Sequence, residues 1–290
     1  MRISVIIPYL NAADTLGETL GALVGQRWPT EWEVIIADNG STDDLGSVLK
    51  PFTSRIPSLN VVDASAKRGA AYARNLAVHQ ARGDKILFCD ADDVPGAGWA
   101  AALAESLHHH DFVAARFEFD RLNPPSIAAT RRGTQADALQ TCRFLPFPFA
   151  GAGSLGILKR MHAEVGGFDE RMSVCEDTDY CMRLQFAGRK LVFVPDALLH
   201  YRLRTTQSQM YLQGVRYAES NVFLYKKYSP RSSWELWRWR AYSHSLRALL
   251  GRTPDLTRTQ EGKALLAWRL GIHTGAFMGA VKFGAPPVMA

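Results

Sequence analysis

The sequence predicts an α/β protein with an open, mostly parallel sheet, helices on both faces and a helical C-terminal extension. Short β-branched runs alternate with segments of helical periodicity through the first 110 residues. From residue 211 onward the pattern changes to helical segments rich in Trp, Tyr and Arg. With 290 residues, 47% of them hydrophobic, the chain is long enough for a large core.

The expected elements follow in order. Leu16, Leu20 and Leu23 recur at helical spacing after the first strand, with Asp14 as the expected N-cap. A polar loop is expected at 121–137, followed by an aromatic and then glycine-rich stretch at 143–160. We expect strands at 2–9, 32–40, 59–64, 85–93, 111–120 and 191–204, and helices at 14–26, 71–83 and 98–110.

Polar side chains follow several of these strands at their ends. Asn11 follows the first strand, Asp38 and Asn39 follow the second, and the run Asp90, Ala91, Asp92, Asp93 follows the fourth. In an open α/β sheet, ligands bind beyond the carboxyl ends of the strands, so these residues are expected to converge. Three acids there suit a hard cation such as magnesium or manganese. The alternative is an acidic cap on the next helix.

Six motifs occur in one order over residues 3–204: VIIPYLNAADTL, IIADNGSTDD, KRGAAYARNLAV, ILFCDADD, VGGFDERM with CEDTDYCMRL, and FVPDALLHYRLR. Together they resemble family 2 of the glycosyltransferases, enzymes with the GT-A fold that use nucleotide-sugars. The resemblance implies a nucleotide-sugar-binding half at 1–110 and an acceptor-binding, catalytic half at 111–210. Residues 211–290 then form a basic, Trp-rich helical extension.

The resemblance also implies roles for individual residues. Asp177 matches the acid that deprotonates the acceptor hydroxyl, with Glu176 as the competing base, and Gly166 and Gly167 set the loop that aims it. Asp90 and Asp92 match the DxD pair, and His200 a further metal or diphosphate contact. Asp93 is expected to support the acids. The residues expected to bind the nucleotide-sugar are Pro8, Tyr9, Asn11, Asp38, Asn39, Arg68, Arg74, Asp90, Ala91 and Asp92.

The expected reaction is inverting transfer of one sugar from a nucleotide-sugar to a glycan, lipid-linked or small-molecule acceptor, with Mn²⁺ or Mg²⁺ as cofactor. The chain departs from the family pattern at Leu10, where an aromatic often stacks on uracil, and at Asn39, where an acid is usual. UDP-sugar is the default donor, and other bases stay open. No Gln-x-x-Arg-Trp motif follows Asp177, which favours a non-processive enzyme.

The positive charge belongs to the C-terminal part. From residue 226 onward there are eleven Lys or Arg against three acids, whereas residues 1–225 sum to −2. Trp234, Trp237 and Trp239 beside Arg238 and Arg240 fit an interfacial helix on an anionic membrane, a helix packed on the core, or a dimer contact. No nucleic-acid-binding module accompanies the charge.

The cysteines and the His-rich run are expected to have no catalytic or metal-binding role. Four cysteines without CxxC spacing predict reduced thiols, and His108–His110 are expected to be solvated at a helix end rather than metal ligands. The sequence shows no signal peptide or transmembrane run, so we expect a cytoplasmic enzyme, peripheral at the inner face of the membrane if the tail binds lipid.

Two other functions fit the same pattern less well. A nucleotidyltransferase that makes nucleotide-sugars would share the nucleotide-binding sheet and an acidic metal site, but it would carry a glycine- and lysine-rich signature near the N-terminus that this chain lacks. A non-catalytic nucleotide-sugar-binding protein would have no need of all the candidate catalytic acids.

Overall fold

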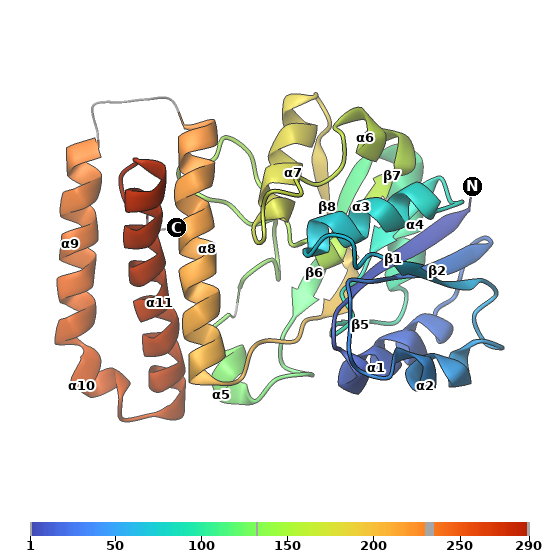
Figure 1. Cartoon of the computed structure of the whole chain (residues 1–290), viewed down its shortest axis with the longest axis horizontal. Helices are drawn as coiled ribbons and strands as arrows, with labels where there is room; N and C mark the ends of the chain where they lie inside the picture. The colour runs from blue at the N-terminus through green and yellow to red at the C-terminus, as the bar shows by residue number, and fades with distance from the viewer. Residues whose placement is uncertain (1, 132, 230–234, 289–290) are drawn as a thin grey trace. The chain divides into compact units, whose positions relative to one another are not determined.

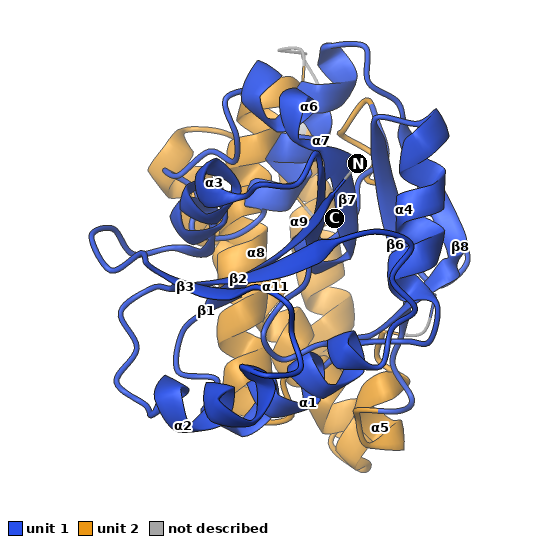
Figure 2. Ribbon diagram, turned by 90° about the vertical axis from the view of Figure 1, so that its right-hand side faces the viewer, with its two compact units in different colours: residues 1–121, 133–140, 147–202 blue, residues 122–132, 141–146, 203–290 orange. Residues whose placement is uncertain are grey.

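The computed structural model describes residues 2–131, 133–229 and 235–288, which form two compact units. Unit 1 comprises residues 1–121, 133–140 and 147–202, and unit 2 comprises residues 122–132, 141–146 and 203–290 (Figure 2). The two short segments of unit 2 interrupt unit 1 in the sequence: residues 122–132 belong to the expected polar loop, and residues 141–146 overlap the start of the aromatic stretch that follows.

Unit 1 is built on one eight-stranded sheet with the order β3-β2-β1-β4-β7-β6-β8-β5 (Figure 1). The pairs β1–β2, β2–β3, β1–β4 and β6–β8 are parallel, as expected, and β7 and β5 pair antiparallel with their neighbours. Because β1, β2 and β4 run in parallel, their carboxyl ends lie at one edge. The strands are β1 (Ile3–Tyr9), β2 (Trp32–Asp38), β3 (Leu59–Asp63), β4 (Lys85–Phe88), β5 (Val94–Pro95), β6 (Phe112–Glu118), β7 (Leu155–Leu158) and β8 (Leu191–His200).

Helices cover both faces of this sheet. α1 (Ala13–Val24) buries Leu16, Leu20 and Leu23 and lies with α2 on one side of β1–β3, while α3 lies on the other (Figures 1 and 2). α4 packs against β4, β6, β7 and β8. The other helices of unit 1 are α2 (Leu45–Leu49), η1 (Lys50–Phe52), α3 (Ala70–Gln80), α4 (Trp99–His109), η2 (Ala152–Ser154), α6 (Lys159–Glu164) and α7 (Glu176–Phe186).

The expected N-cap of α1 is wrong. Asp14 is the second helical residue, and Ala12 occupies the cap position without a side-chain hydrogen bond. The carboxylate of Asp43, far away in the sequence, accepts the N–H of Ala13 at 2.8 Å instead. A long-range contact thus satisfies a helix end that local sequence does not cap.

β7 falls in the stretch 143–160, which was expected to be aromatic and then glycine-rich and in which no strand was predicted. It pairs antiparallel with β4 and β6, and Gly156 at its centre has no room for a side chain. A Cβ there would lie 2.9 Å from Val113 and 3.1 Å from Leu87. The glycine that obscured the strand pattern is therefore what lets the strand sit in a crowded core.

Unit 2 is helical. It contains α5 (Pro125–Ala128), α8 (Gln207–Tyr228), α9 (Glu235–Gly251), α10 (Thr253–Leu256) and α11 (Gln260–Phe283). The glycines of α11 do not break it, because three of them lie where α11 packs closely against α8. A Cβ on Gly271, Gly275 or Gly279 would lie 2.2 Å, 2.0 Å or 3.0 Å from the carbonyl oxygens of Tyr211, Val215 and Glu219 on α8.

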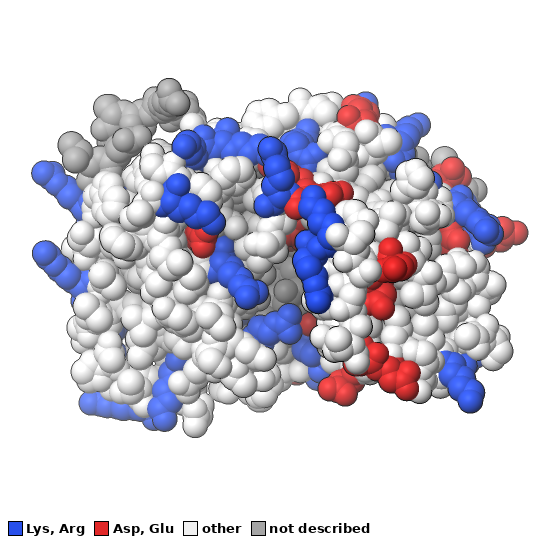
Figure 3. Space-filling view, in the orientation of Figure 1, with Lys and Arg blue, Asp and Glu red and all other residues white. Residues whose placement is uncertain are grey.

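The structure also bears on the cysteines and on the expected absence of a membrane span. All four cysteines are free thiols, as predicted. Among the helices of the described residues, none is both long enough and apolar enough to cross a membrane. On the face drawn in Figure 3, the surface over α8, α9 and α11 carries Lys and Arg with few acids, whereas acids gather over α1 and α2. Trp234 lies outside the described residues.

Candidate active site

Arg74 joins three segments of unit 1 into one buried cluster. Its side chain projects from α3 and is only 4% exposed. Nη2 donates to Oδ1 of Asp90, just beyond β4, and Nη1 donates to Oε1 of Glu176, at the first turn of α7, both at 2.7 Å. A planar guanidinium can bind two carboxylates at once, which a lysine cannot do with the same geometry. The cluster brings the acids after β4 and the acids of α7 to one place.

Asp177 lies beside this cluster, and two backbone amides hold its carboxylate. The N–H of Thr178 donates to Oδ1 at 2.7 Å, and the N–H of Ala152 donates to Oδ2 at 3.1 Å. Burial raises the pKa of Asp177; the two amides and Arg74 oppose that rise, and Asp90 adds to it. A buried carboxylate with a raised pKa is a suitable proton acceptor, because it holds the proton more strongly than an exposed acid.

Glu176 has a different environment. Burial, followed by the charge of Asp177, raises its pKa to about 7, although Arg74 opposes the rise. Arg74 binds the carboxylate of Glu176, whereas uncharged groups bind that of Asp177: the two amides named above and the Thr178 hydroxyl, 3.4 Å from Oδ1. Adjacent acids with environments this different are suited to different roles.

The turn η2 separates Asp90 from Asp177. Its Ala152 amide binds Asp177, and its Gly153 packs against Asp90 so closely that a Cβ would lie 3.0 Å from Oδ2. A Cβ on Gly151 would likewise lie 2.9 Å from the ring of Phe117. The glycines are needed for this close approach of the backbone to the site.

The three acids after β4 are not equivalent. Asp93 is 1% exposed; its Oδ1 accepts the N–H of Arg202 at 2.9 Å, and its Oδ2 is buried without a hydrogen bond. Burial and then the charges of Asp92 and Asp90 raise its pKa well above the usual range. Asp92 is half-buried, and its carbonyl accepts from Nε of Arg202. Asp93 therefore anchors the loop, while Asp90 and Asp92 are the more accessible acids.

The residues expected around the nucleotide base form a second cluster at the ends of β1 and β2. Asn11, at a left-handed φ of 49°, accepts the N–H of Thr42 on Oδ1 at 2.8 Å. Asp38 caps the same loop by accepting the N–H of Ser41. The Tyr9 hydroxyl donates to Asp43 at 2.7 Å, so burial and that acid raise its pKa. Pro8 is a half-buried strand residue paired with Ala37.

Asn39 organises the loop that carries Arg68. Its amide nitrogen donates to the carbonyls of Ala64 and Lys67, and its amide oxygen accepts the N–H of Gly69. Arg68 is exposed and donates to the carbonyl of Asn39 at 3.0 Å. The acid usual at this position could not make the two donations, because a carboxylate only accepts. Asn39 thus positions the loop, and its departure from the family pattern has a structural reason.

The remaining expected residues are engaged with their neighbours. Nδ1 of His200 is hydrogen-bonded to Glu118 at 2.5 Å across β6 and β8, which leaves Nε2 of the ring. Burial favours the neutral form of Glu118, but the contact with His200 and the backbone amides of Asp120 and Arg121 together outweigh burial and lower the pKa of the acid. The carbonyl of Ala91 accepts the hydroxyls of Thr15 and Thr19 and ties the acidic loop to α1.

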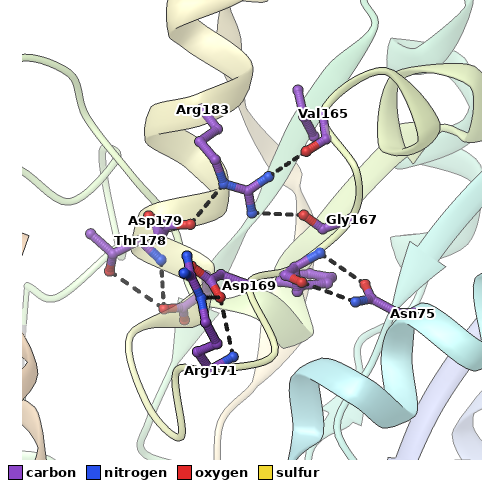
Figure 4. A network of polar contacts seen from close by, with 10 residues as sticks. Asn75, Val165, Gly167, Asp169, Arg171, Thr178, Asp179 and Arg183 are labelled. Carbon is purple, nitrogen blue, oxygen red and sulfur yellow. Dashed lines mark hydrogen bonds and ion pairs between the residues drawn. The ribbon is translucent and has the colours of Figure 1, made fainter. Parts of the chain in front are cut away.

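The loop that leads into α7 is fixed from both sides (Figure 4). Arg183 of α7 donates to Asp179 and to the carbonyls of Val165 and Gly167. Asn75 of α3 accepts the N–H of Phe168 and donates to its carbonyl. Gly167 has a φ of 72°, and a Cβ on it would lie 2.5 Å from Oδ1 of Asn75. The glycine expected to set this loop is needed for both reasons.

The acids suit a divalent cation that takes few protein ligands. Arg74 binds Oδ1 of Asp90 and leaves Oδ2 as an oxygen donor, and Asp92 supplies a second carboxylate. Among the described residues, no group of three or more His, Cys, Asp or Glu side chains is arranged to hold a metal. Magnesium and manganese accept such a set, because phosphate oxygens and water fill their other positions.

Sequence reasoning missed several contributors to this site. Asp43 and Asn75 lie inside two of the quoted motifs but were assigned no role, and the amide of Ala152 is a backbone group that no side-chain motif reports. Gln135, which supports η2, lies in the stretch expected to be a polar loop, yet it is 1% exposed.

An α/β sheet of this order, with paired acids beyond β4 and a buried acid at the start of α7, is the architecture of a GT-A glycosyltransferase. The family model "Glycosyl transferase family 2" matches residues 4–165, more than half of the chain, and "Glycosyl transferase family group 2" matches residues 85–274. The chain belongs to glycosyltransferase family 2.

Curated relatives and solved structures agree with this assignment. The chain is 26% identical over 199 residues to glycosyltransferase AglE of Haloferax volcanii, covering 68% of this chain and 65% of AglE. It is 29% identical over 220 residues to the pre-mycofactocin glycosyltransferase of Mycobacterium tuberculosis, covering 70% of this chain and 43% of that protein. The chain thus spans less than two thirds of these relatives.

Two solved structures share the fold. The mannosyltransferase PcManGT from Pyrobaculum calidifontis, in complex with GDP-Man and Mn²⁺, aligns with a TM-score of 0.59 at 18% identity, over 99% of this chain and 76% of that one. S. aureus TarS 1–349 in complex with UDP-GlcNAc aligns with a TM-score of 0.54 at 20% identity, over 98% and 93%. The GT-A fold expected from the sequence is confirmed, including the helices that follow the sheet domain.

Proposed function

We propose that this protein is a non-processive, inverting glycosyltransferase that moves one sugar from a nucleotide-sugar to an acceptor hydroxyl, with Asp177 as the general base. One observation carries the proposal: Arg74 binds Asp90 and Glu176 together, so the acids expected at the donor diphosphate lie beside the expected base. UDP-sugar is the default donor, and GDP-sugar is the first alternative, since PcManGT was solved with GDP-Man.

The chain's own residues divide the work. Asp177, held by the amides of Thr178 and Ala152, accepts the proton of the incoming hydroxyl on the face of the sugar opposite the leaving group. General base catalysis of this kind typically contributes about 10²–10⁴-fold. Glu176 keeps Arg74 in place. Arg68, on the loop held by Asn39, binds the ribose and phosphates.

Asp90 and Asp92 would hold a Mn²⁺ or Mg²⁺ ion, with Nε2 of His200 as a further contact. When bound, the ion would neutralise the negative charge that develops on the diphosphate leaving group. The oxygen donors of the two acids match the preference of these cations. Arg74 adds a fixed positive charge next to Asp90.

The first experiment is a donor screen. UDP-GlcNAc, UDP-glucose and GDP-mannose are incubated with the protein and candidate acceptors, with and without Mn²⁺, and released nucleoside diphosphate is measured. We expect metal-dependent release and, by NMR of the product, an inverted anomeric centre. Pyrophosphate-dependent formation of a nucleoside triphosphate would instead support a nucleotidyltransferase, and binding without turnover would support a non-catalytic binding protein.

The second experiment tests the base. Asp177→Asn should abolish transfer and leave donor binding, measured by calorimetry, unchanged. Asp196→Asn, at an exposed position of β8, is the matched control and should transfer sugar at the normal rate. Turnover of Asp177→Asn near the normal rate would show that another group accepts the proton.

We infer further that the C-terminal helices contact the surface of an anionic membrane. A lipid-linked acceptor used in polysaccharide or glycoconjugate synthesis would lie at that surface. Ten large apolar side chains are exposed among the described residues, and six of them lie on α9 and α11: Trp237, Trp239, Leu250, Phe277, Met278 and Val281. Trp239 and Phe277 touch, with ring centroids 6.4 Å apart. Exposed aromatic side chains in a basic segment favour anionic lipid.

Co-sedimentation with vesicles tests this contact. The protein should bind vesicles that contain phosphatidylglycerol more tightly than pure phosphatidylcholine. The double variant Trp239→Ser, Phe277→Ser should lose that preference, whereas Phe186→Ser, an exposed position in unit 1, should keep it. A concentration-dependent dimer that the double variant abolishes, with no lipid binding, would assign the surface to a second copy of the chain.

A further inference from the structure

Gln135 is a buried glutamine with every polar atom of its side chain in use. It is 1% exposed. Nε2 donates to the carbonyl of Ala115 at 2.8 Å and to Oγ of Ser154 at 2.7 Å. Oε1 accepts the N–H of Gly151 at 3.0 Å and Nε2 of Gln140 at 2.9 Å. The side chain therefore ties β6 to both ends of the turn η2.

The backbone of Gln135 is tied to the same strand. Its carbonyl accepts the N–H of Phe117 on β6 at 2.9 Å. Its φ is 51°, in the left-handed region, which costs a residue with a side chain about 1–2 kcal/mol. Such a conformation persists only where surrounding contacts impose it.

The turn Gly151–Ser154, which Gln135 fixes, lies against two groups of the active site. The Ala152 amide donates to Asp177, and Gly153 packs against the carboxylate of Asp90. The hydrogen bonds of the Gln135 side chain go to other residues. The tether acts on Gly151 and Ser154, the residues on either side of Ala152 and Gly153.

We propose that Gln135 is a positioning residue of the transfer reaction: it fixes the turn Gly151–Ser154 between Asp90 and Asp177, and so sets the separation of the donor site from the base. The inference rests on the proposed function. Gln135 touches neither substrate nor base, and it acts through the turn. A displacement of about 1 Å in a catalytic constellation can cost on the order of 10²-fold in rate.

The left-handed residues provide a second observation. Among the described residues, three residues other than glycine have a positive φ: Asn11, Gln135 and Cys175. Asn11 joins the loops after β1 and β2, and Cys175 directly precedes Glu176 and Asp177. The other two left-handed residues thus lie at the candidate active site, and Gln135 is the third. This distribution is expected because strained backbone conformations are concentrated at functional positions.

The test compares Gln135→Met with Gln140→Met. Methionine has the length of glutamine but forms no comparable hydrogen bond, and Gln140→Met removes one bond to Gln135 without touching the turn. With whichever of UDP-GlcNAc, UDP-glucose or GDP-mannose the wild type turns over, Gln135→Met should lower kcat about 10–100-fold. Its Kd for the corresponding nucleoside diphosphate should stay within about twofold, since that site lies on other loops. Gln140→Met should keep a normal kcat.

A readout without substrate separates this inference from the proposed function. Hydrogen exchange of the Ala152 amide should accelerate about tenfold or more in Gln135→Met and stay unchanged in Gln140→Met. If Gln135→Met does not fold, Gln135→Gly replaces it, because glycine removes the side chain and relieves the left-handed strain. A normal kcat with slow Ala152 exchange, or an equal loss in Gln140→Met, overturns the proposal. A wild type that transfers no sugar refutes the proposed function, whatever the exchange shows.

Discussion

Gly153 packs so closely against Asp90 that a side chain on the glycine would crowd the carboxylate. A Cβ built on Gly153 would lie 3.0 Å from Cγ and Oδ2 of Asp90 and 3.2 Å from its backbone nitrogen. The φ of Gly153 is not in the left-handed region, so conformational freedom does not explain the glycine. Space does. The turn that carries the Ala152 amide can approach Asp90 only because one methyl group is missing.

Gly153→Ala should therefore impair the enzyme more than it impairs the fold. The added methyl must displace either the turn or Asp90, and we expect kcat/KM to fall by about tenfold or more. Steady-state kinetics and thermal unfolding measure the two effects. Gly17→Ala is the control, because it lies in α1 with nothing within 4 Å of its Cβ and should raise stability by about 0.5–1 kcal/mol. Normal kinetics in Gly153→Ala would show that the turn can move to accommodate the methyl group without disturbing the site, and would contradict the prediction.

Arg74→Lys should destabilise the protein although it conserves the charge. A lysine ammonium cannot bind both acids with the same geometry, so either the half-buried Asp90 or the more deeply buried Glu176 loses its partner. Breaking a buried pair in this way costs about 3–5 kcal/mol. Urea unfolding measures the loss. Arg171→Lys, at an exposed ion pair with Asp169, should change stability by less than about 1 kcal/mol. Equal effects of the two substitutions would contradict a bridging role.

Glu176 should make stability fall as the pH rises from about 4.5 to about 7. Its pKa in the fold is about 7, against 4.5 ordinarily, so the folded state binds the proton more tightly than the unfolded state in this window. The slope approaches about 1.4 kcal/mol per pH unit for one such group. Urea unfolding of wild type and Glu176→Gln at several pH values measures it. Asp93 acts in the same direction in both proteins, and the charge of Asp177 helps to raise the pKa of Glu176, so the difference between the two curves reports Glu176 together with its interaction with Asp177. Parallel curves would refute the prediction.

Gly275→Ala should destabilise unit 2. Its Cβ would lie 2.0 Å from the carbonyl oxygen of Val215, so α8 and α11 must move apart. Overpacking of this kind typically costs about 1–3 kcal/mol, or more where backbone must shift. Gly251→Ala, at the end of α9 with nothing within 4 Å, is the matched control. Thermal unfolding compares the two, and a melting temperature of Gly275→Ala above that of wild type would contradict the packing described here.

The parts of the fold that follow a regular period were predictable from the sequence. The strands β1, β2, β3 and β6 and the helices α1, α3 and α4 begin and end within three residues of the expected bounds, whereas β4 and β8 end four or five residues earlier than expected. β7 was missed because it has four residues, one of them a glycine required by its neighbours. The cap of α1 was wrong because the carboxylate that binds its first amide comes from Asp43, and sequence proximity cannot reveal a tertiary contact.

The site was predictable to the extent that its chemistry resides in side chains at strand ends. Asp90, Glu176 and Asp177 could be selected from motifs, and the loops after β1 and β2 do converge through Asn11 and Thr42. The Ala152 amide and the buried Gln135 could not be selected. One is backbone, and the other is a polar residue in a polar stretch, whose burial is decided by the chain that folds over it.

The glycines of α11 have a consequence for how the C-terminal helices can move. Gly271, Gly275 and Gly279 each sit under a carbonyl of α8 and recur every four residues. A shift of α11 along α8 by four residues, about 6 Å, would place Ala267 where Gly271 now lies or Phe283 where Gly279 now lies, and that side chain would meet a carbonyl of α8. The three glycines therefore allow one relative position of the two helices along their axes, so the length of α11 that extends past α8 is fixed by sequence.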